Sequence, residues 1–394
     1  MSVSDNPLMQ HMNPLGTIDP ATFLHDYWQK KPLLVRQAFP IEEPPISKEE
    51  LGGLACEEEV SSRIVQEHHC TGPWKVDYGP FDESSFAALP DNNWTLLVSD
   101  CEKHAPELRF LTEPFRFLPD WRIDDLMISY AADGGSVGPH TDDYDVFLIQ
   151  LDGVREWQID TRLEESEIIE DIELKILKTF KPEQSWRLEP GDMLYLPPRV
   201  AHYGIARGEC MTGSVGFRAP GYRDILQDFL EEALLRTPES RRYQDAGMTM
   251  QQHSSEITPE TVSHFRSIVQ SLTETDDATF KQWLGRFLTE VKTDTLPPED
   301  TPELTLAEFH NAMAHGCLFE RSEFSRLAYI MDGESLTLFA DRQAYPAPTT
   351  LLNDIRLICR EYSFSASALG HLGNNELVEL LYRLYRNDVL FPVA

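Results

Sequence analysis

The sequence predicts a mainly β fold with added helices: a barrel or sandwich, then a helical region and a small α+β domain. Three observations support this prediction. Residues 1 to about 220 contain many short apolar segments separated by Gly and Pro, such as GDMLYLPP and TGSVGFRAP. After Pro220 the apolar residues recur at helical spacing, as in RDILQDFLEEALL. Near the C-terminus, Asp332-Gly333 is typical of a hairpin turn.

These changes of pattern divide the chain into three expected regions. The β-rich region covers residues 1–220, the helical region covers residues 221–295, and the α+β domain covers residues 304–394. The segment LPPEDTPE, residues 296–303, is typical of a linker. The last domain combines a predicted hairpin with a helix and a short apolar strand in NNELVELLYRLYRNDVLFPV.

The second predicted helix of the helical region carries an apolar stripe with two possible roles. Thr258 is suited to the N-cap and Pro259 to the first helical position. The stripe fits a buried core, which is the default expectation, or a dimer surface. Its members are Phe265, Ile268, Val269 and Leu272.

The formal net charge of -32 over 394 residues limits the partners of this protein. Such a surface repels nucleic-acid phosphates and attracts a basic partner, although the acidity could also serve only solubility. The C-terminal residues 301–394 contain seven Arg, no Lys and twelve Asp or Glu, so a winged helix there is not expected to read DNA. We therefore expect no direct nucleic-acid binding.

The expected location is the cytoplasm, without membrane association. The N-terminal residues show no signal-peptide pattern, and no apolar stretch is long enough to span a bilayer. The six cysteines are scattered and form no C-x-x-C pair. This distribution is typical of a reduced compartment and not of a disulfide framework.

The segment GGSVGPHTDDYDVFLIQLDG contains a candidate metal motif at His140 and Asp142. In an extended strand these two residues point to the same face. Two imidazoles and one carboxylate form the facial triad of iron(II) oxygenases, and His202, just after a strand ending in Pro197-Pro198, is the candidate third ligand. Either histidine taken alone would more often be an ordinary hydrogen-bonded residue. The sequence thus predicts a metal site on a double-stranded β-helix, provided the two strands meet.

Arg155, in LDGVREWQID, is the candidate for binding a cosubstrate carboxylate. Arginine presents a fork of donors that matches a carboxylate, and Arg155 is close in sequence to the metal strand. The alternative is a surface arginine that pairs with Glu156 or Asp160. Burial of the side chain distinguishes the two.

These segments resemble a known family, the JmjC-domain ribosomal oxygenases of bacteria, of the YcfD type. The most specific resemblance is PDWRIDDLMISYAADGGSVGPHTDDYDVFLIQLDGVREWQID, and YWQKKPLLVRQAF, EPGDMLYLPPRVAHYG and SVGFRAP are also similar. The resemblance implies a JmjC barrel, a helical dimerisation region and a C-terminal winged-helix-like domain. It also implies an iron(II)- and 2-oxoglutarate-dependent dioxygenase that hydroxylates an arginine β-carbon in ribosomal protein sixteen of the large subunit.

Carried over residue by residue, the resemblance assigns roles to seven residues. His140, Asp142 and His202 would hold iron, and Arg155 would bind the distal carboxylate of 2-oxoglutarate. Ser129, in MISY, would be a further cosubstrate contact. The two residues that would hold the target side chain are Asp133 and Tyr144.

Two departures from the family pattern concern the target pocket and not the iron. The loop reads ADGGSVGP where relatives have a PGGG-like stretch, and Asp143 stands where some relatives carry an amide. Asp145 has two possible roles. It could join Asp133, Asp143 and Tyr144 around a cationic target, or it could be structural at the turn before VFLIQL.

Two other functions stay open on the sequence alone. One is an oxygenase with another target, either a different protein residue or a small molecule; the extra domains favour a macromolecule. The other is a non-catalytic cupin-like binding protein, which would not need an internal cation such as Arg155. The preferred interpretation is a homodimeric enzyme acting on a basic ribosomal protein with iron(II), 2-oxoglutarate and dioxygen.

Overall fold

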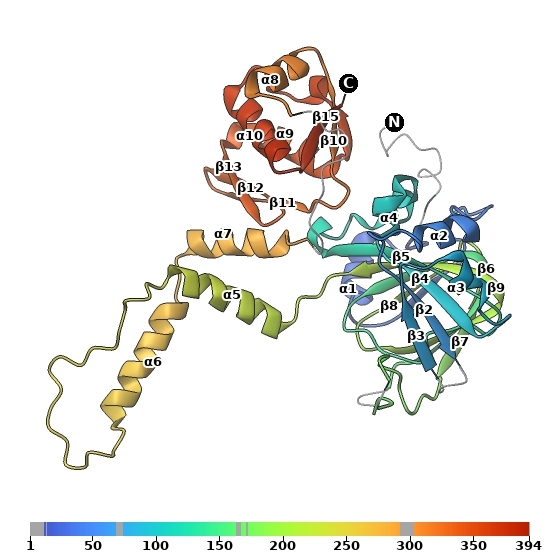
Figure 1. Cartoon of the computed structure of the whole chain (residues 1–394), viewed down its shortest axis with the longest axis horizontal. Coiled ribbons are helices and arrows are strands. Elements are labelled where there is room, and N and C mark those ends of the chain that lie inside the picture. The colour runs from blue at the N-terminus through green and yellow to red at the C-terminus, as the bar shows by residue number, and fades with distance from the viewer. Residues whose placement is uncertain are drawn as a thin grey trace. The chain divides into compact units, whose positions relative to one another are not determined.

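A computed structural model describes residues 12, 14–67, 74–162, 167–170, 172–291 and 303–393. The chain forms two compact units, Met1–Ala219 and Pro220–Ala394 (Figure 1). Within the described ranges, no helix has the length and apolar character needed to cross a membrane. The predicted linker at residues 296–303 lies outside the described residues as far as residue 302.

The first unit is built on one nine-stranded sheet whose neighbouring strands all pair antiparallel. The strand order is β1-β8-β6-β9-β5-β4-β2-β3, and β7 pairs with β6 off this path. The strands are β1 (Leu33–Val35), β2 (Ser62–Glu67), β3 (Trp74–Tyr78), β4 (Trp94–Val98), β5 (Ile123–Ala131), β6 (Val146–Asp160), β7 (Gln184–Leu188), β8 (Met193–Leu196) and β9 (Ala201–Phe217).

The long strands β6 and β9 carry the candidate site, and both faces of β6 are covered. Phe147 and Ile149 belong to the large core cluster of this unit, whereas Val146 and Leu148 belong to a second cluster with Trp157. Successive strand residues point to opposite faces, so a strand buried on both sides is nearly continuously apolar. This explains the run VFLIQL at the start of β6.

Short helices flank this sheet, and three of them, α1, α2 and α3, begin with side-chain caps. Asp19 accepts a hydrogen bond from the backbone of Thr22 at the start of α1, and Ser47 forms a capping box with Glu50 at the start of α2. The helices are α1 (Pro20–Asp26), α2 (Lys48–Leu54), α3 (Glu83–Ala87) and α4 (Cys101–His104), with 3-10 turns at Pro106–Leu111, Glu113–Phe115 and Asp120–Arg122.

The second unit begins with three helices, α5 (Tyr222–Arg236), α6 (Pro259–Thr273) and α7 (Asp277–Leu288). Thr258 caps α6 and Pro259 opens it, as predicted. The expectation that the α6 stripe packs in a core is wrong, because no α6 residue is buried. Phe265 and Val269 are 52% and 60% exposed.

The remainder of the second unit is a small α+β domain with its own core. The predicted hairpin turn at Asp332-Gly333 is confirmed, since β11 and β12 pair on either side of it and Gly333 has a φ of 58°. The helices are α8 (Leu306–Ala314), α9 (Leu352–Arg360) and α10 (Asn375–Arg386). The strands form two sheets, β14-β10-β15 and β11-β12-β13: β10 (Leu318–Arg321), β11 (Leu327–Asp332), β12 (Ser335–Ala340), β13 (Gln343–Ala347), β14 (Ser363–Ser365) and β15 (Leu390–Val393).

Candidate metal and cosubstrate site

The connection between β5 and β6 places His140 beside His202, at the start of β9. The backbone N–H of His140 donates to His202 O at 3.0 Å, and the N–H of His202 donates to His140 O at 2.9 Å. This isolated antiparallel bridge joins two segments that are far apart in the sequence. The bridge brings the two predicted histidines together. His202 lies near the end of the β6–β9 ladder, and His140 lies outside that ladder.

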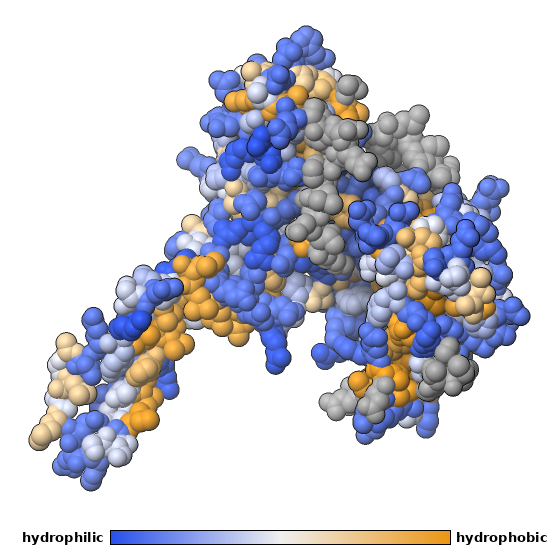
Figure 2. Space-filling model, viewed as in Figure 1, coloured by the Kyte–Doolittle hydropathy of each residue, from blue (hydrophilic) through white to orange (hydrophobic). Residues whose placement is uncertain are grey.

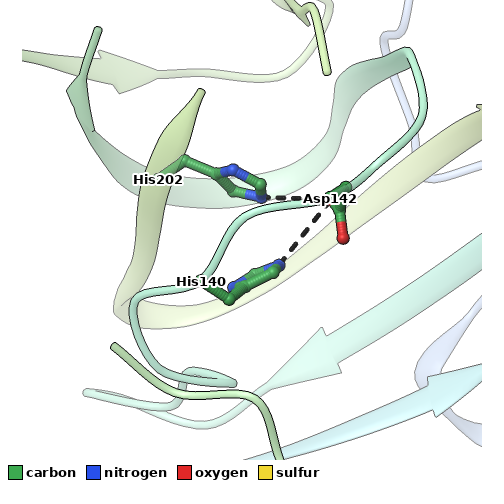
Figure 3. Close-up of side chains that lie close together, drawn as sticks. All are labelled: His140, Asp142 and His202. Carbon is green, nitrogen blue, oxygen red and sulfur yellow. Dashed lines mark ion pairs between the residues drawn. The ribbon is translucent and has the colours of Figure 1, made fainter. Parts of the chain in front are cut away.

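His140, Asp142 and His202 converge on one point (Figure 3). Asp142 Oδ2 lies 3.8 Å from His140 Nε2 and 3.5 Å from His202 Nε2. The candidate ligand atoms all lie within 4.8 Å of one another. Among the described residues this is the one group of three or more His, Cys, Asp or Glu side chains arranged to hold a metal ion.

The hydrogen bonds of the two imidazoles fix which ring nitrogen is available. His140 Nδ1 lies 2.9 Å from Gly138 O, and His202 Nδ1 lies 2.9 Å from Val200 O. A carbonyl oxygen only accepts, so each Nδ1 carries the proton and each Nε2 keeps a lone pair. Burial, and then the neighbouring His140, lower the pKa of His202 to about 4. The neutral imidazole that a metal requires is therefore the favoured form.

Two neutral imidazole nitrogens and one carboxylate oxygen suit a divalent first-row metal. This donor set leaves coordination positions for other ligands and is the arrangement used by non-haem iron(II) oxygenases. His202 is buried while Asp142 and His140 are partly exposed. A metal held here would thus face both the protein interior and an open side.

Arg155 lies inside the first unit, so the surface interpretation is wrong. The residue is 5% exposed, and its Nη1 donates to Ser129 Oγ at 3.3 Å. Its Nε and Nη2 are buried and have no hydrogen-bond partner among the described residues. Burying a charged group with unmade hydrogen bonds is costly, so these donors point to an anionic ligand.

Ser129 is held in place by the adjacent strand, β9. It lies on β5 opposite Thr212 of β9, is buried, and has its Oγ 3.4 Å from Thr212 O. Thr212 Oγ1 donates in turn to Gln150 Oε1 at 3.1 Å. Both Thr212 and Gln150 were missed by the sequence reasoning. In the sequence, each could have been recognised as a polar residue within a strand that is otherwise apolar because both of its faces are buried.

The predicted target-binding residues are more open than the metal site. Asp133 is exposed, and its Oδ1 accepts a hydrogen bond from Gly208 N at 2.8 Å. Tyr144 is 43% exposed, and its pKa is raised by partial burial and by the carboxylates of Asp142 and Asp125. Tyr144 therefore lies close to the metal triad, whereas Asp133 holds Gly208 in the part of β9 where its pairing with β6 is irregular.

The neighbouring aspartates play different roles. Asp143 is exposed and lies 3.5 Å from Arg199 Nε. Asp145 is fully buried and accepts hydrogen bonds from Tyr195 Oη, Gln29 Nε2 and Arg122 Nη2 at 2.7, 3.0 and 3.0 Å. The burial of Asp145 and its three hydrogen bonds thus support the structural role.

Comparisons with known proteins agree with this architecture. A JmjC-domain family model matches residues 110–225, and a ROXA-like winged-helix model matches residues 271–391. The chain is 36% identical over 353 residues to the ribosomal protein uL16 3-hydroxylase of Escherichia coli strain K12. That match covers 88% of this chain and 92% of the relative.

Solved structures of the E. coli protein YcfD resemble the whole chain. An X-ray structure of YcfD matches with a TM-score of 0.85 and 33% identity, covering 97% of this chain and all of that one. A complex of YcfD, a ribosomal oxygenase, with cobalt and 2-oxoglutarate matches with a TM-score of 0.81 and 32% identity, over 96% and 99% of the two chains. The predicted class, a JmjC barrel with helices and a C-terminal winged-helix domain, is confirmed. This chain belongs to the family of JmjC-domain ribosomal oxygenases.

Proposed function

We propose that this protein is an iron(II)- and 2-oxoglutarate-dependent dioxygenase that hydroxylates an arginine β-carbon in ribosomal protein uL16, the sixteenth protein of the large subunit. The observation that carries the proposal is the His140-Asp142-His202 triad in the same unit as a buried Arg155 with two unpartnered donor nitrogens. The uL16 3-hydroxylase activity named for the E. coli relative supports the choice of substrate. A purely structural metal-binding barrel would not need the buried cation.

The seven candidate residues divide into three groups in this proposal. His140, Asp142 and His202 hold iron(II) through two Nε2 atoms and a carboxylate oxygen. Arg155 and Ser129 bind the distal carboxylate of 2-oxoglutarate. The residues proposed to contact the target side chain are Asp133 and Tyr144.

When bound, iron(II) with 2-oxoglutarate and dioxygen supplies the oxidation that converts a C–H bond to C–OH, with release of succinate and carbon dioxide. The protein contributes position and environment. The backbone acceptors of Gly138 and Val200 keep both imidazoles in the metal-binding tautomer. Arg155, buried beside Ser129, orients the cosubstrate by a charge-assisted contact in a site with little water. The partly exposed side of the triad leaves room for the target side chain.

The charge of the chain supports a basic protein as substrate. At a net charge of -32 the protein attracts a basic loop and repels nucleic acid, and no direct nucleic-acid binding is proposed. Asp133 is exposed and already accepts one hydrogen bond, which leaves acceptor capacity for a guanidinium. A ribosomal target also favours the cytoplasm as the place of action.

We also propose a homodimer that uses the helical region, residues 221–295, as its interface. Figure 2 shows apolar surface along α5 and α6. Exposed apolar patches of this kind usually mark interaction sites. The exposed side chains that support the proposal are Leu226, Leu230 and Leu234 of α5, and Val262, Phe265 and Val269 of α6. In this division, residues 1–220 are the catalytic part and residues 304–394 the winged-helix-like part.

The test is mass spectrometry of candidate ribosomal proteins after incubation with the enzyme, iron(II) and 2-oxoglutarate. We expect a gain of one oxygen on an arginine of uL16. Peptides with Arg, Lys or His at that position then separate the possibilities. Preference for His would overturn the arginine assignment, and 2-oxoglutarate consumption without modification of any ribosomal peptide would indicate another substrate class.

A further inference from the structure

Trp157 lies near both the proposed cosubstrate cation, Arg155, and one ligand of the metal triad, His202. It lies two residues after Arg155 on β6. The Arg155 Cζ lies 5.8 Å from the centre of the Trp157 ring, and the centres of the Trp157 and His202 rings lie 5.9 Å apart. The indole therefore neighbours both parts of the proposed site.

The indole nitrogen of Trp157 is a buried donor without an acceptor. The residue is 5% exposed, and its Nε1 has no hydrogen-bond partner among the described residues. A buried Trp N–H normally finds a partner, because leaving it unpaired is costly. The other buried members of its apolar cluster are aliphatic side chains such as Leu188 and Leu194, and Trp186 packs against the cluster; none of these side chains offers an acceptor.

The position of the indole is fixed by Gly204 on the adjacent strand. Gly204 pairs directly with Trp157 in the β6–β9 ladder. A Cβ built on Gly204 would lie 2.6 Å from the ring, closer than side chains tolerate. The absence of a side chain at residue 204 therefore lets the ring approach the backbone of β9.

Three donor atoms with no acceptor in the described part of the chain therefore lie two residues apart on β6: Nε and Nη2 of Arg155, and Nε1 of Trp157. A carboxylate has about four lone-pair positions, enough to accept a hydrogen bond from each of these three nitrogen atoms. We propose that Trp157 is a cosubstrate-binding residue whose indole N–H donates a hydrogen bond to the 2-oxoglutarate carboxylate that Arg155 binds. This inference rests on the function proposed above.

The test compares 2-oxoglutarate binding by zinc-loaded wild-type protein and Trp157→Phe, measured by calorimetry on the full chain. Zinc suits the same ligands and has no redox chemistry, so binding is measured without turnover. Phenylalanine retains an aromatic ring but removes the N–H. We expect the Kd to rise about 10- to 100-fold, as for a hydrogen bond to a charged group. An unchanged Kd would overturn the proposal.

Trp186→Phe is the matched control. Trp186 lies directly opposite Trp157 on β7 and is only partly buried, and no contact of Trp186 with Arg155 or His202 is seen in the described structure. Its substitution removes the same N–H from the same sheet. We expect the Kd of Trp186→Phe to match the wild type, whereas equal weakening in both variants would indicate loss of packing and contradict the proposal.

Two further measurements separate this proposal from the one on which it rests. Arg155→Ala should weaken binding in the same assay; if it does not, the proposed cosubstrate site itself fails. Zinc affinity should be the same in wild type and Trp157→Phe, because the variant leaves the triad intact. With ¹⁵N-labelled indoles, the resonance lost in Trp157→Phe should shift when 2-oxoglutarate is added to the wild type. A resonance that does not move would contradict a direct hydrogen bond.

Discussion

Two regions of the molecule lack interaction partners of opposite kinds. One is the buried face of β6 that carries Arg155 and Trp157, and the other is the exposed apolar stripe of α6. On the strands, Nε and Nη2 of Arg155 and Nε1 of Trp157 are buried without an acceptor among the described residues. On the helix, apolar side chains such as Phe265 and Val269 are exposed to solvent. A buried unpaired donor requires a small polar ligand, whereas an exposed apolar stripe requires a large apolar surface. The proposed cosubstrate site on β6 and the proposed interface on α6 can therefore be told apart by their own side chains, without a bound partner.

The largest expected effect comes from the metal triad. His202→Ala removes one of the three proposed metal ligands, and we expect turnover to fall by at least about 100-fold. This loss exceeds the one expected when a residue that only hydrogen-bonds to a ligand is changed. Coupled 2-oxoglutarate consumption and product mass spectrometry measure this loss. Circular dichroism should show a folded protein. Near-wild-type consumption by the variant would show that His202 is not a ligand.

The second-largest expected effect comes from Arg155, the buried cation of β6. Arg155→Ala should raise the KM for 2-oxoglutarate by about 100-fold or more, since removing one partner of a buried charge pair costs about 3–5 kcal/mol. Steady-state kinetics at saturating peptide provide the measurement. Arg207→Ala is a useful control, because Arg207 pairs with Glu156 on the exposed side. If both variants keep the wild-type KM, the carboxylate is bound elsewhere.

The α6 stripe gives a contrasting prediction. Phe265→Asp combined with Val269→Asp should convert the proposed dimer to a monomer, because two charges would be buried at an apolar interface. Sedimentation velocity measures the change in mass. Calorimetric 2-oxoglutarate affinity should stay at the wild-type value if the site and the stripe are independent.

The charge-matched control for this prediction lies on the opposite side of α6. Ser263→Asp combined with Ser267→Asp adds the same two charges at exposed positions of the helix. We expect this variant to sediment like the wild type. A monomeric wild type, or dissociation of both variants alike, would remove the proposed role of the stripe.

The two faces were predictable from the sequence to different degrees. The metal triad was expected from the His-x-Asp spacing and the family resemblance, but the assumed extended strand is absent: His140 forms only an isolated bridge with His202, and β6 begins later, at Val146. The burial of Arg155 could not be decided from sequence, since Glu156 and Asp160 offered plausible surface partners. The α6 stripe has the same periodicity whether it faces a core or a partner. Periodicity identifies a face but not what covers it.

Trp157 and Asp145 show why contacts across strands are harder to predict. Trp157 looks like an ordinary core aromatic until its pairing with Gly204 and the lack of an acceptor are known. Asp145, next to Tyr144, looked equally suited to a target pocket. Its partners Gln29, Arg122 and Tyr195 come from three distant segments, and only the fold brings them to it.

The smallest predicted effect concerns a buried acid in the first unit, away from both faces. Glu102 is buried and accepts a hydrogen bond from Leu126 N at 2.9 Å, and burial raises its pKa from 4.5 to about 7. Below pH 4.5 the folded and unfolded states are both protonated. Between pH 4.5 and 7 the unfolded state releases this proton while the folded state retains it. Stability therefore falls as pH rises through this window, by roughly 3 kcal/mol.

Glu102→Gln should remove this pH dependence, because the amide keeps a carbonyl acceptor for Leu126 N and cannot ionise. We expect the variant to match the wild type near pH 4.5 and to be more stable at pH 8, as measured by denaturant unfolding across the range. Only the transition of the first unit should change, since Glu102 belongs to that unit. Glu107→Gln, at an exposed position, removes the same formal charge and is the control. If the wild type and Glu102→Gln lose stability in parallel between pH 4.5 and 7, then Glu102 is ionised in the folded state and its buried carboxylate is stabilised by Lys103.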